Sequence, residues 1–196
     1  MDPYELKLLI KMSKEIFIPI TAGGGIKKIE DIKNLLLAGA DRVCINTELL
    51  ENPNFISEVS SIFGNQFLSV NIDVKKIDNE YFCMKNHGRD SSGIKLSEWL
   101  AFLKKKSVAE ILIYSVDNDG LCVGPDLELL DHLNQIKLNM PCIYGGGLLE
   151  KDDILKILKN YNLSGISIST SLHFNKINIK TIKNYLKENK ININEI

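Results

Sequence analysis

Residues 19–26, with the sequence PITAGGGI, decide the fold because they occur twice. They return as residues 141–148, PCIYGGGL, so that each copy is an apolar run ending in glycines. An acidic pair followed by isoleucine then opens a helical pattern, at Glu30 in the first copy and at Asp152 in the second. A short apolar run, a glycine turn and a helical pattern together indicate a βα unit. The repeat therefore predicts a duplicated α/β protein.

Six short apolar runs alternate with helical patterns along the chain. Several, such as VCIN and ILIYS, are continuously apolar, as expected of parallel strands buried on both faces. Strands that alternate with helices favour parallel βαβ construction. The pattern breaks between Asp73 and Gly93, where we expect a short hairpin and a Gly/Ser-rich loop before a helix from Lys95 to Lys105. The predicted strands are residues 17–21, 41–46, 67–73, 109–115, 140–145 and 164–169.

The repeat continues into the next strand ends, where Ile45-Asn46-Thr47 corresponds to Ile168-Ser169-Thr170. This spacing is typical of a half-barrel duplication. Two equal halves of an eight-stranded barrel would put the glycine turns in units three and seven. We therefore expect residues 1–196 to form a single partial domain, a TIM-type (β/α)₈ barrel of about six βα units that lacks the first two.

Composition narrows the class of protein. The chain has 196 residues, 44% of them hydrophobic and 25% charged, which is average for a globular domain. A net charge of −1 gives no field that would collect nucleic acid or an anionic membrane surface. No run approaches the roughly 18 apolar residues of a membrane span, and the charged start is not a signal peptide. We expect a cytoplasmic protein that binds neither nucleic acid nor membrane.

The cysteines give no metal motif. Four are present, and none forms a CxxC pair. We therefore predict reduced thiols, no metal and no cofactor. The four are Cys44, Cys83, Cys122 and Cys142.

The two glycine turns predict a ligand with a phosphate at each end. Backbone N–H groups of a glycine-rich turn between a strand and a helix can cradle a phosphate. Asn46 and Thr47 follow the strand after the first turn, and Ser169 and Thr170 follow the strand after the second. Hydroxyl and amide groups there would close each pocket. The alternative is that these residues only cap the following helices.

Carboxylates lie at predicted strand ends. Asp73 ends the run FLSVNID, and Asp117 and Asp119 follow ILIYS. Catalytic groups of barrels sit at the carboxyl ends of the strands, where a carboxylate can act as general acid or base. An apolar strand has no structural need for Asp73, whereas Asp117 and Asp119 could equally be turn residues before Gly120.

Three further charged residues have two readings each. His87 lies near Arg89 in the Gly/Ser-rich loop and would either contact an anionic substrate or stay solvated. Arg42 and Glu110 begin two strands, so they would lie at the opposite mouth of the barrel. There they would dock or gate something, or simply be solvated strand-end charges.

These motifs, in this order, resemble the cyclase-subunit family of imidazole glycerol phosphate synthase. The resemblance covers essentially the whole chain. It implies a (β/α)₈ barrel in which ammonia from a glutaminase partner reacts with a bis-phosphorylated ribulosyl phosphoribosyl aminoimidazole carboxamide. The segments that carry it are GGGIKKIEDIKNLLLAGADRVCINTELLENPNFI from residue 23, the NID strand, SVDNDG from 115 with DLELL, STSLHF from 169, and INIKTIKNYLKEN from 177.

The resemblance also implies roles for particular residues. Asp73 matches a catalytic aspartate of the family, and Asp119 joins it as our second catalytic candidate. Arg42 and Glu110 match members of a charged ring at the ammonia entrance. The predicted phosphate ligands are Gly25, Asn46 and Thr47 for one site, and Gly120, Gly146, Gly147, Ser169 and Thr170 for the other.

Several departures from the family keep two alternatives open. The family's catalytic aspartate on the first strand and the lysine of the loop after it would precede Met1. Tyr114, Tyr144, Gly145 and the pair Leu121-Cys122 replace smaller or more polar residues near the second turn. One alternative is the related branch that supplies ammonia for sugar amidation in surface-polysaccharide biosynthesis. The other is an inactive, N-terminally truncated fragment.

Overall fold

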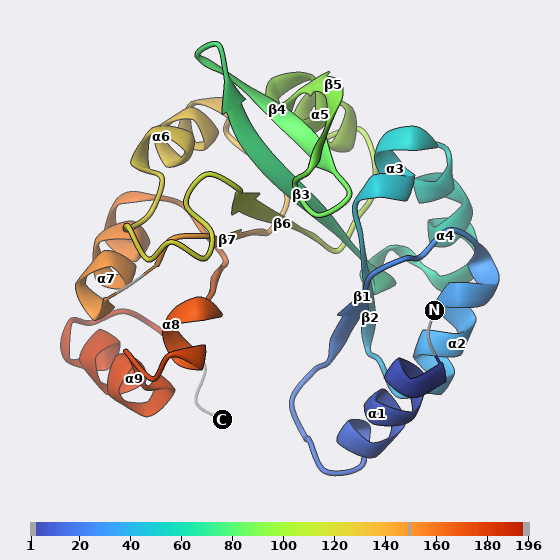
Figure 1. The fold of residues 1–196 in the computed structure, drawn as a ribbon, viewed down its shortest axis with the longest axis horizontal. Helices are drawn as coiled ribbons and strands as arrows, with labels where there is room; N and C mark the ends of the chain where they lie inside the picture. Colours follow the sequence, from blue (N-terminus) through green and yellow to red (C-terminus); the bar gives the residue numbers. More distant parts are fainter. Residues whose placement is uncertain (1–2, 149, 194–196) are drawn as a thin grey trace.

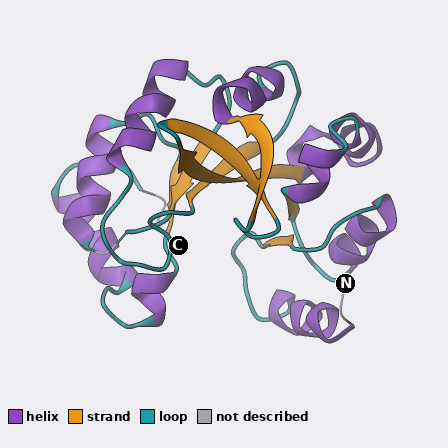
Figure 2. Ribbon diagram, turned by 45° about the horizontal axis from the view of Figure 1, so that its top comes forward, coloured by secondary structure: helices purple, strands orange, loops and turns teal. Residues whose placement is uncertain are grey.

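A computed structural model describes residues 3–148 and 150–193. Its eight-stranded sheet curls on itself, and helices cover the outer face (Figures 1 and 2). Six strands pair in the order β1-β2-β3-β6-β7-β8, all parallel, while β4 and β5 form an antiparallel hairpin on β3. The predicted parallel α/β fold is confirmed. The strands are β1 (Thr21–Gly23), β2 (Arg42–Ile45), β3 (Leu68–Ile77), β4 (Glu80–Lys85), β5 (Asp90–Lys95), β6 (Glu110–Ser115), β7 (Cys142–Gly145) and β8 (Gly165–Ser167).

The helices follow the strands as the alternating pattern predicts, with one addition. Helix α1 lies in the charged N-terminal segment, for which we predicted no element. None of the helices in the described ranges is both long and apolar enough to cross a membrane. The helices are α1 (Pro3–Ser13), α2 (Ile29–Leu37), α3 (Thr47–Glu51), α4 (Phe55–Phe63), α5 (Leu96–Leu103), α6 (Leu127–Ile136), α7 (Lys151–Asn160), α8 (Thr170–His173) and α9 (Ile179–Glu188), with a 3₁₀ turn at Asn65–Phe67.

The repeated acidic pairs start the two equivalent helices. Asp31 accepts hydrogen bonds from the backbone N–H groups of Lys27 (3.0 Å) and Lys28 (3.2 Å) at the start of α2. Asp153 accepts one from the N–H of Glu150 (3.2 Å) at the start of α7. These N–H groups have no partner within the helix, so a carboxylate in the first turn satisfies them and also favours the helix dipole. The repeated acidic residues therefore have the same structural role in both copies, which is to stabilise the first turn of a helix.

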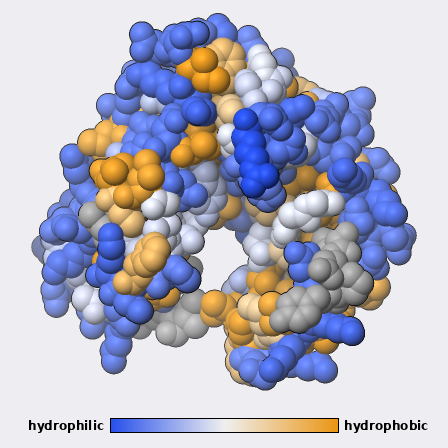
Figure 3. Space-filling model, in the orientation of Figure 1, coloured by the Kyte–Doolittle hydropathy of each residue, from blue (hydrophilic) through white to orange (hydrophobic). Residues whose placement is uncertain are grey.

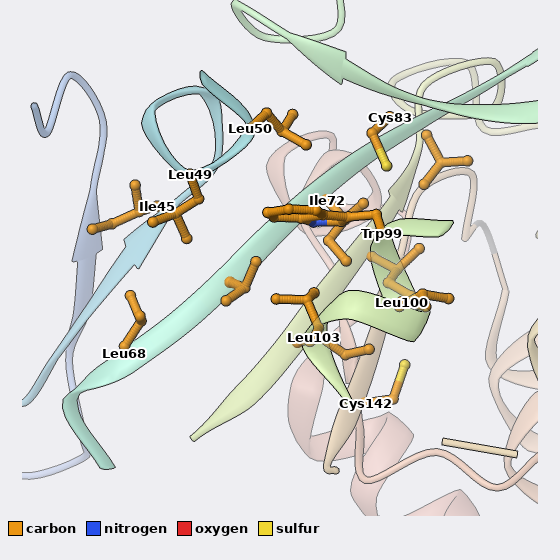
Figure 4. Packing of buried hydrophobic residues seen from close by; sticks show 14 of the residues in the cluster. Ile45, Leu49, Leu50, Leu68, Ile72, Cys83, Trp99, Leu100, Leu103 and Cys142 are labelled. Atoms are coloured by element: carbon orange, nitrogen blue, oxygen red, sulfur yellow. The ribbon is translucent and has the colours of Figure 1, made fainter. Parts of the chain in front are cut away.

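The core lies between the sheet and the helices. Val70, Ile72 and Val74 alternate along β3 with 0–1% of their surfaces exposed. They face inward-pointing residues of α5 such as Trp99 and Leu100, and Figure 4 shows Ile72 beside Trp99. Burying each such side chain contributes about 1.5–3 kcal/mol. The residues between them, Ser69 and its i+2 neighbours, point to the concave face of the sheet.

Two predicted strand boundaries are wrong, and the segment predicted as a Gly/Ser-rich loop forms strand β5. β1 begins at Thr21 rather than at residue 17, and Phe17 and Ile18 are 96% and 46% exposed. Only residues 21–23 have strand partners, in register with Arg42 to Cys44, so pairing and not hydropathy sets the limit of β1. β3 runs on to Ile77 because β4 pairs with its second half. Asp73 therefore lies within a strand and not at its end.

The carboxyl ends of the six parallel strands meet at one end of the curled sheet. The glycine turns follow β1 and β7, and Asp73 and the hairpin rise from β3 between them. Figure 3 shows the molecule hollowed at its centre, between the arm that carries β1 and the arm that carries β8. The two turns thus lie at the same end of the strands, one after the edge strand β1 and the other after β7, next to the opposite edge strand.

Candidate active site

The first glycine turn opens onto a cavity of about 560 Å³, here called the N-terminal cavity. Gly24 and Gly25 have φ angles of 110° and 65°, a region that other residues rarely adopt. A Cβ built on either would meet nothing within 4 Å, so their backbone is open to a ligand. Asn46, Thr47, Asp73 and His87 line the same cavity, together with Gly23, Lys27, Cys44, Glu48, Glu51, Asn71 and Asn86 among others.

The second glycine turn borders a much smaller space of about 10 Å³, here called the C-terminal cavity. Gly146 and Gly147 also have positive φ angles, 104° and 78°. The loop after β6 folds onto this turn, because Gly124 N–H donates to the Gly147 carbonyl at 2.9 Å. The predicted ligands of the second phosphate all line this space: Gly120, Gly146, Gly147, Ser169 and Thr170, with Tyr114 and Asp119 beside them.

The hydroxyl and amide residues after the strands do not cap helices with their side chains. Neither Asn46 at the start of α3 nor Ser169 at the start of α8 makes a side-chain cap hydrogen bond. Thr47 instead accepts a hydrogen bond of 3.0 Å from the backbone N–H of Asn86, at the tip of the β4–β5 hairpin. The Thr47 O–H remains a donor for a ligand. The capping alternative is therefore not what the structure shows for Asn46 and Ser169.

Asp73 has two amide donors on its carboxylate. Asn46 Nδ2 donates to Oδ2 at 3.0 Å, and Asn71 Nδ2 donates to Oδ1 at 2.9 Å. Burial raises the pKa of Asp73 above its ordinary value, while the two hydrogen bonds and the charge of His87 oppose that rise. We did not predict Asn71. Its position two residues before Asp73, and so on the same face of the strand, was the available signal.

Asn46 presents an acceptor, not a donor, to a ligand. Its Nδ2 also donates to the Met84 carbonyl at 3.0 Å, so the amide nitrogen is occupied on both sides. Its Oδ1 is buried and has no hydrogen-bond partner within the described part of the chain. A buried unpaired acceptor costs about 1–3 kcal/mol, and a hydroxyl or N–H of a bound molecule would satisfy it.

The two candidate catalytic aspartates line different cavities, Asp73 the N-terminal one and Asp119 the C-terminal one. They are close enough for the charge of Asp119 to contribute to the raised pKa of Asp73. Asp117 has a structural task, because its carboxylate accepts a hydrogen bond of 3.0 Å from the backbone N–H of Lys76 and ties the loop after β6 to the second half of β3.

Arg42 and Glu110 pair at the opposite end of the strands. Arg42 Nη1 lies 2.9 Å from Glu110 Oε2, and Ser69 donates to Glu110 Oε1 at 2.7 Å. The three residues come from β2, β3 and β6, so this mouth of the sheet is bridged by one polar network. The described residues hold no group of three or more His, Cys, Asp or Glu side chains placed to bind a metal ion.

Comparison with known proteins gives the family. The family model for histidine biosynthesis proteins matches residues 2–178. The chain is 37% identical to imidazole glycerol phosphate synthase subunit HisF of Natranaerobius thermophilus over 188 residues, which are 96% of this chain and 74% of that protein. It is 39% identical to the HisF subunit of Dictyoglomus thermophilum, over 94% of this chain and 73% of that protein. For the HisF subunit of a Thermotoga species the identity is 33%, over 96% and 74%.

These matches cover both arms of the molecule, including both glycine turns, the hairpin and the strand of Asp73. Identities above 30% over nine-tenths of the chain show the family. The chain belongs to the histidine biosynthesis protein family and, within it, to the HisF subunits of imidazole glycerol phosphate synthase.

Proposed function

We propose that this chain catalyses the cyclase reaction of imidazole glycerol phosphate synthase in histidine biosynthesis. Ammonia would react with ribulosyl phosphoribosyl aminoimidazole carboxamide to give imidazole glycerol phosphate and aminoimidazole carboxamide ribotide. Membership of the HisF family supports this reaction. The observation that carries this proposal to particular atoms is the N-terminal cavity, where an open glycine turn and the partly buried, hydrogen-bonded carboxylate of Asp73 face the same space.

The finer fold assignment belongs to the same proposal. The six parallel strands would correspond to strands three to eight of a (β/α)₈ barrel, within a single domain. Two observations support this: the curl of the sheet and the equivalent places of the two glycine turns, after β1 and after β7.

Each phosphate of the substrate would lie at one glycine turn. In the N-terminal cavity, the N–H groups around Gly25 and the hydroxyl of Thr47 are the donors, while Asn46 Oδ1 accepts from a substrate hydroxyl. In the C-terminal cavity the corresponding groups are those of Gly146, Gly147, Ser169 and Thr170, with Gly120 on the opposite wall. Backbone donors with positive φ suit phosphate because they converge without side chains in the way.

Asp73 would hold or move the proton during cyclisation. A general acid or base works best when its pKa lies near the working pH. Burial shifts the pKa of Asp73 upward, in that direction, and the amides of Asn46 and Asn71 keep the carboxylate aimed into the cavity. Asp119 would assist from the neighbouring cavity wall.

Ammonia would enter at the mouth bridged by Arg42 and Glu110. That mouth is at the far end of the strands from the cavities, so a glutaminase partner docked there would deliver ammonia along the concave face of the sheet. The residues that line this path between the mouth and Asp73 come from alternate positions of β2, β3 and β6. We place the reaction in the cytoplasm.

The experiment is turnover of the ribulosyl substrate with an ammonium salt, measured for the chain alone and with a co-expressed fragment that supplies two further βα units. Asp73→Asn should lower turnover by about 10²- to 10⁴-fold and leave substrate binding nearly unchanged, since a positioned acid or base supplies that factor. Asp78→Asn is the matched control, because Asp78 is an exposed residue of the turn between β3 and β4, with a φ of 48° that asparagine tolerates. Unchanged turnover in Asp73→Asn would remove Asp73 from the mechanism.

A second candidate function is ammonia supply for sugar amidation in surface-polysaccharide biosynthesis. The size of the C-terminal cavity favours it, because about 10 Å³ is far less than the space at the first turn. Turnover of the ribulosyl substrate would exclude this candidate as the main activity. Absence of turnover with either preparation, while phosphate still binds, would favour it.

A further inference from the structure

The side chain of Tyr114, on β6, extends across the concave face of the sheet, past β7, to β8. It lies on β6 opposite Gly145 of β7, and Gly145 lies opposite Ser167 of β8. The hydroxyls of Tyr114 and Ser167 form a hydrogen bond, so the aromatic ring spans the strand between them. Burial raises the pKa of Tyr114 above its ordinary value, so the phenol stays neutral. The Tyr114 ring thus lines the C-terminal cavity beside the second glycine turn.

Gly145 is what makes room for this ring. A Cβ at position 145 would lie 2.4 Å from Cε1 and 2.8 Å from Cδ1 of Tyr114, well inside ordinary contact distance. The φ angle of Gly145 is not in the left-handed region, so steric room is the reason for glycine there and backbone conformation is not. Tyr114 and Gly145 are therefore one coupled steric unit.

The C-terminal cavity, which Tyr114 lines, is small. Its volume of about 10 Å³ matches the space that one water molecule needs on the same measure, about 10–15 Å³. A phosphate group is several times larger than a water molecule. The N-terminal cavity, where no such ring lies across the strands, has about 560 Å³. The glycines of the two turns thus have similar backbone conformations, but the cavities beside them differ in volume.

We propose that Tyr114, seated on Gly145, is a specificity-determining residue that narrows the C-terminal cavity, so that phosphate binds there more weakly than at the first glycine turn. A ligand with one phosphate binds in the N-terminal cavity without moving the ring. A ligand with a phosphate at each end must first break the hydrogen bond to Ser167 and displace the ring, which weakens its binding. The proposal rests on the proposed function only in taking the two glycine turns as the places where phosphate binds.

The first test counts phosphates by NMR titration with inorganic phosphate, read at the backbone amides of each turn. In the wild-type protein we expect the amides of Gly24 and Gly25 to shift and those of Gly146 and Gly147 to stay. In Tyr114→Thr we expect both pairs to shift. Tyr185→Phe is the control, because it removes a tyrosine hydroxyl on α9, away from both cavities, and should behave as wild type.

Two outcomes would overturn the proposal. One is a wild-type protein in which both turns respond at the same phosphate concentration. The other is a Tyr114→Thr variant in which Gly146 and Gly147 still do not respond. Neither result depends on turnover, so the NMR titration tests the role of Tyr114 even if the chain does not convert the ribulosyl substrate.

If the chain is active, Tyr114→Thr should lower KM for the bis-phosphorylated substrate and leave kcat within about twofold, because the ring opposes binding and not chemistry.

The second test probes the steric unit without any ligand. Gly145→Ala should lower the Tm of the wild-type protein by roughly 2–10 °C, as overpacking does in a chain of this size. The same change in the Tyr114→Thr background should cost almost nothing. An equal loss of Tm in both backgrounds would show that the ring does not lie over Gly145, and the proposal would fall.

Discussion

At the scale of single residues, the environment of Asp73 shows two opposing influences on one carboxyl. Burial favours its neutral form, and the amide hydrogens of Asn46 and Asn71 favour its charged form. Asn46 cannot be turned around, because both of its amide hydrogens face acceptors, Asp73 and the Met84 carbonyl. The buried Oδ1 that results is left for a ligand. The amides of Asn46 and Asn71 thus fix the orientation of the Asp73 carboxyl and also affect its pKa.

A change of Asn71 should therefore move the pH dependence of turnover. Asn71→Leu removes the 2.9 Å hydrogen bond that stabilises the carboxylate, so the pKa of Asp73 rises further. Whether Asp73 acts as base or as acid, the limb of the pH–rate profile that reports it moves to higher pH. Asn139→Leu, in an exposed loop, is the control. A limb that moves to lower pH or stays in place would show that Asn71 does not stabilise the charged form.

At the scale of elements, the β4–β5 hairpin joins the two arms of the active face. On one side, the tip of the hairpin is held to the start of α3, because the backbone N–H of Asn86 donates a hydrogen bond to the Thr47 hydroxyl. On the other side, Gly88 packs so closely on Val116 that a Cβ there would lie 2.9 Å from a Val116 methyl group. Asn86 and His87 both have positive φ angles, 51° and 59°, which non-glycine residues adopt at a cost. Contacts on both sides hold this conformation.

Thr47→Val should loosen the hairpin tip without changing the shape of the residue. It removes the acceptor of the Asn86 N–H, and a hydrogen bond of this kind contributes about 0.5–1.5 kcal/mol. The exchange rate of the Asn86 amide hydrogen should then rise by roughly 2- to 12-fold. Thr47→Ser keeps the hydroxyl and should keep the slow exchange. If valine and serine gave the same exchange rate, the Thr47 hydroxyl would not be what holds the tip.

At the scale of the whole molecule, the Arg42–Glu110 pair ties β2 to β6 at the mouth opposite the cavities. The Arg42 side chain is 40% exposed and that of Glu110 is 15% exposed, so solvent screens the pair only in part. Ser69 of β3 holds the second carboxylate oxygen and fixes Glu110 in place. A pair of this exposure contributes about 1 kcal/mol, and it does so between strands far apart in the sequence.

A double-mutant cycle measures this contribution. Arg42→Ala, Glu110→Ala and the double variant should give a coupling free energy of about 1 kcal/mol from urea unfolding. The same coupling should shrink in high salt, since the Arg42 side chain is 40% exposed. The corresponding cycle for Lys33 and Glu30, which are 3.9 Å apart and exposed on α2, should give a smaller value. Additive losses for Arg42 and Glu110 would mean that the mouth is not held by their charge.

Much of the fold and part of the site could be predicted from local sequence. Three signals each act within one βα unit: the continuous apolar runs, the glycine turns and the repeated acidic pairs. The parallel α/β order was therefore predictable. It was also predictable which candidate ligands would lie near the first turn and which near the second. The predicted boundaries failed where pairing decides, at the start of β1 and along β3 beyond Asp73. A strand ends where its neighbour ends, which a single segment does not encode.

The sequence by itself determined the βα units, the two glycine turns and the carboxylate that faces the first of them, because hydropathy period and glycine content act locally. Only the tertiary structure decided the rest. The partners Asn46 and Asp73, Thr47 and Asn86, and Tyr114 and Ser167 are 27, 39 and 53 residues apart, and only the packing of the whole fold brings each pair together. Register also put Gly145 beneath the ring of Tyr114, which lines the smaller of the two cavities, about 10 Å³ against about 560 Å³.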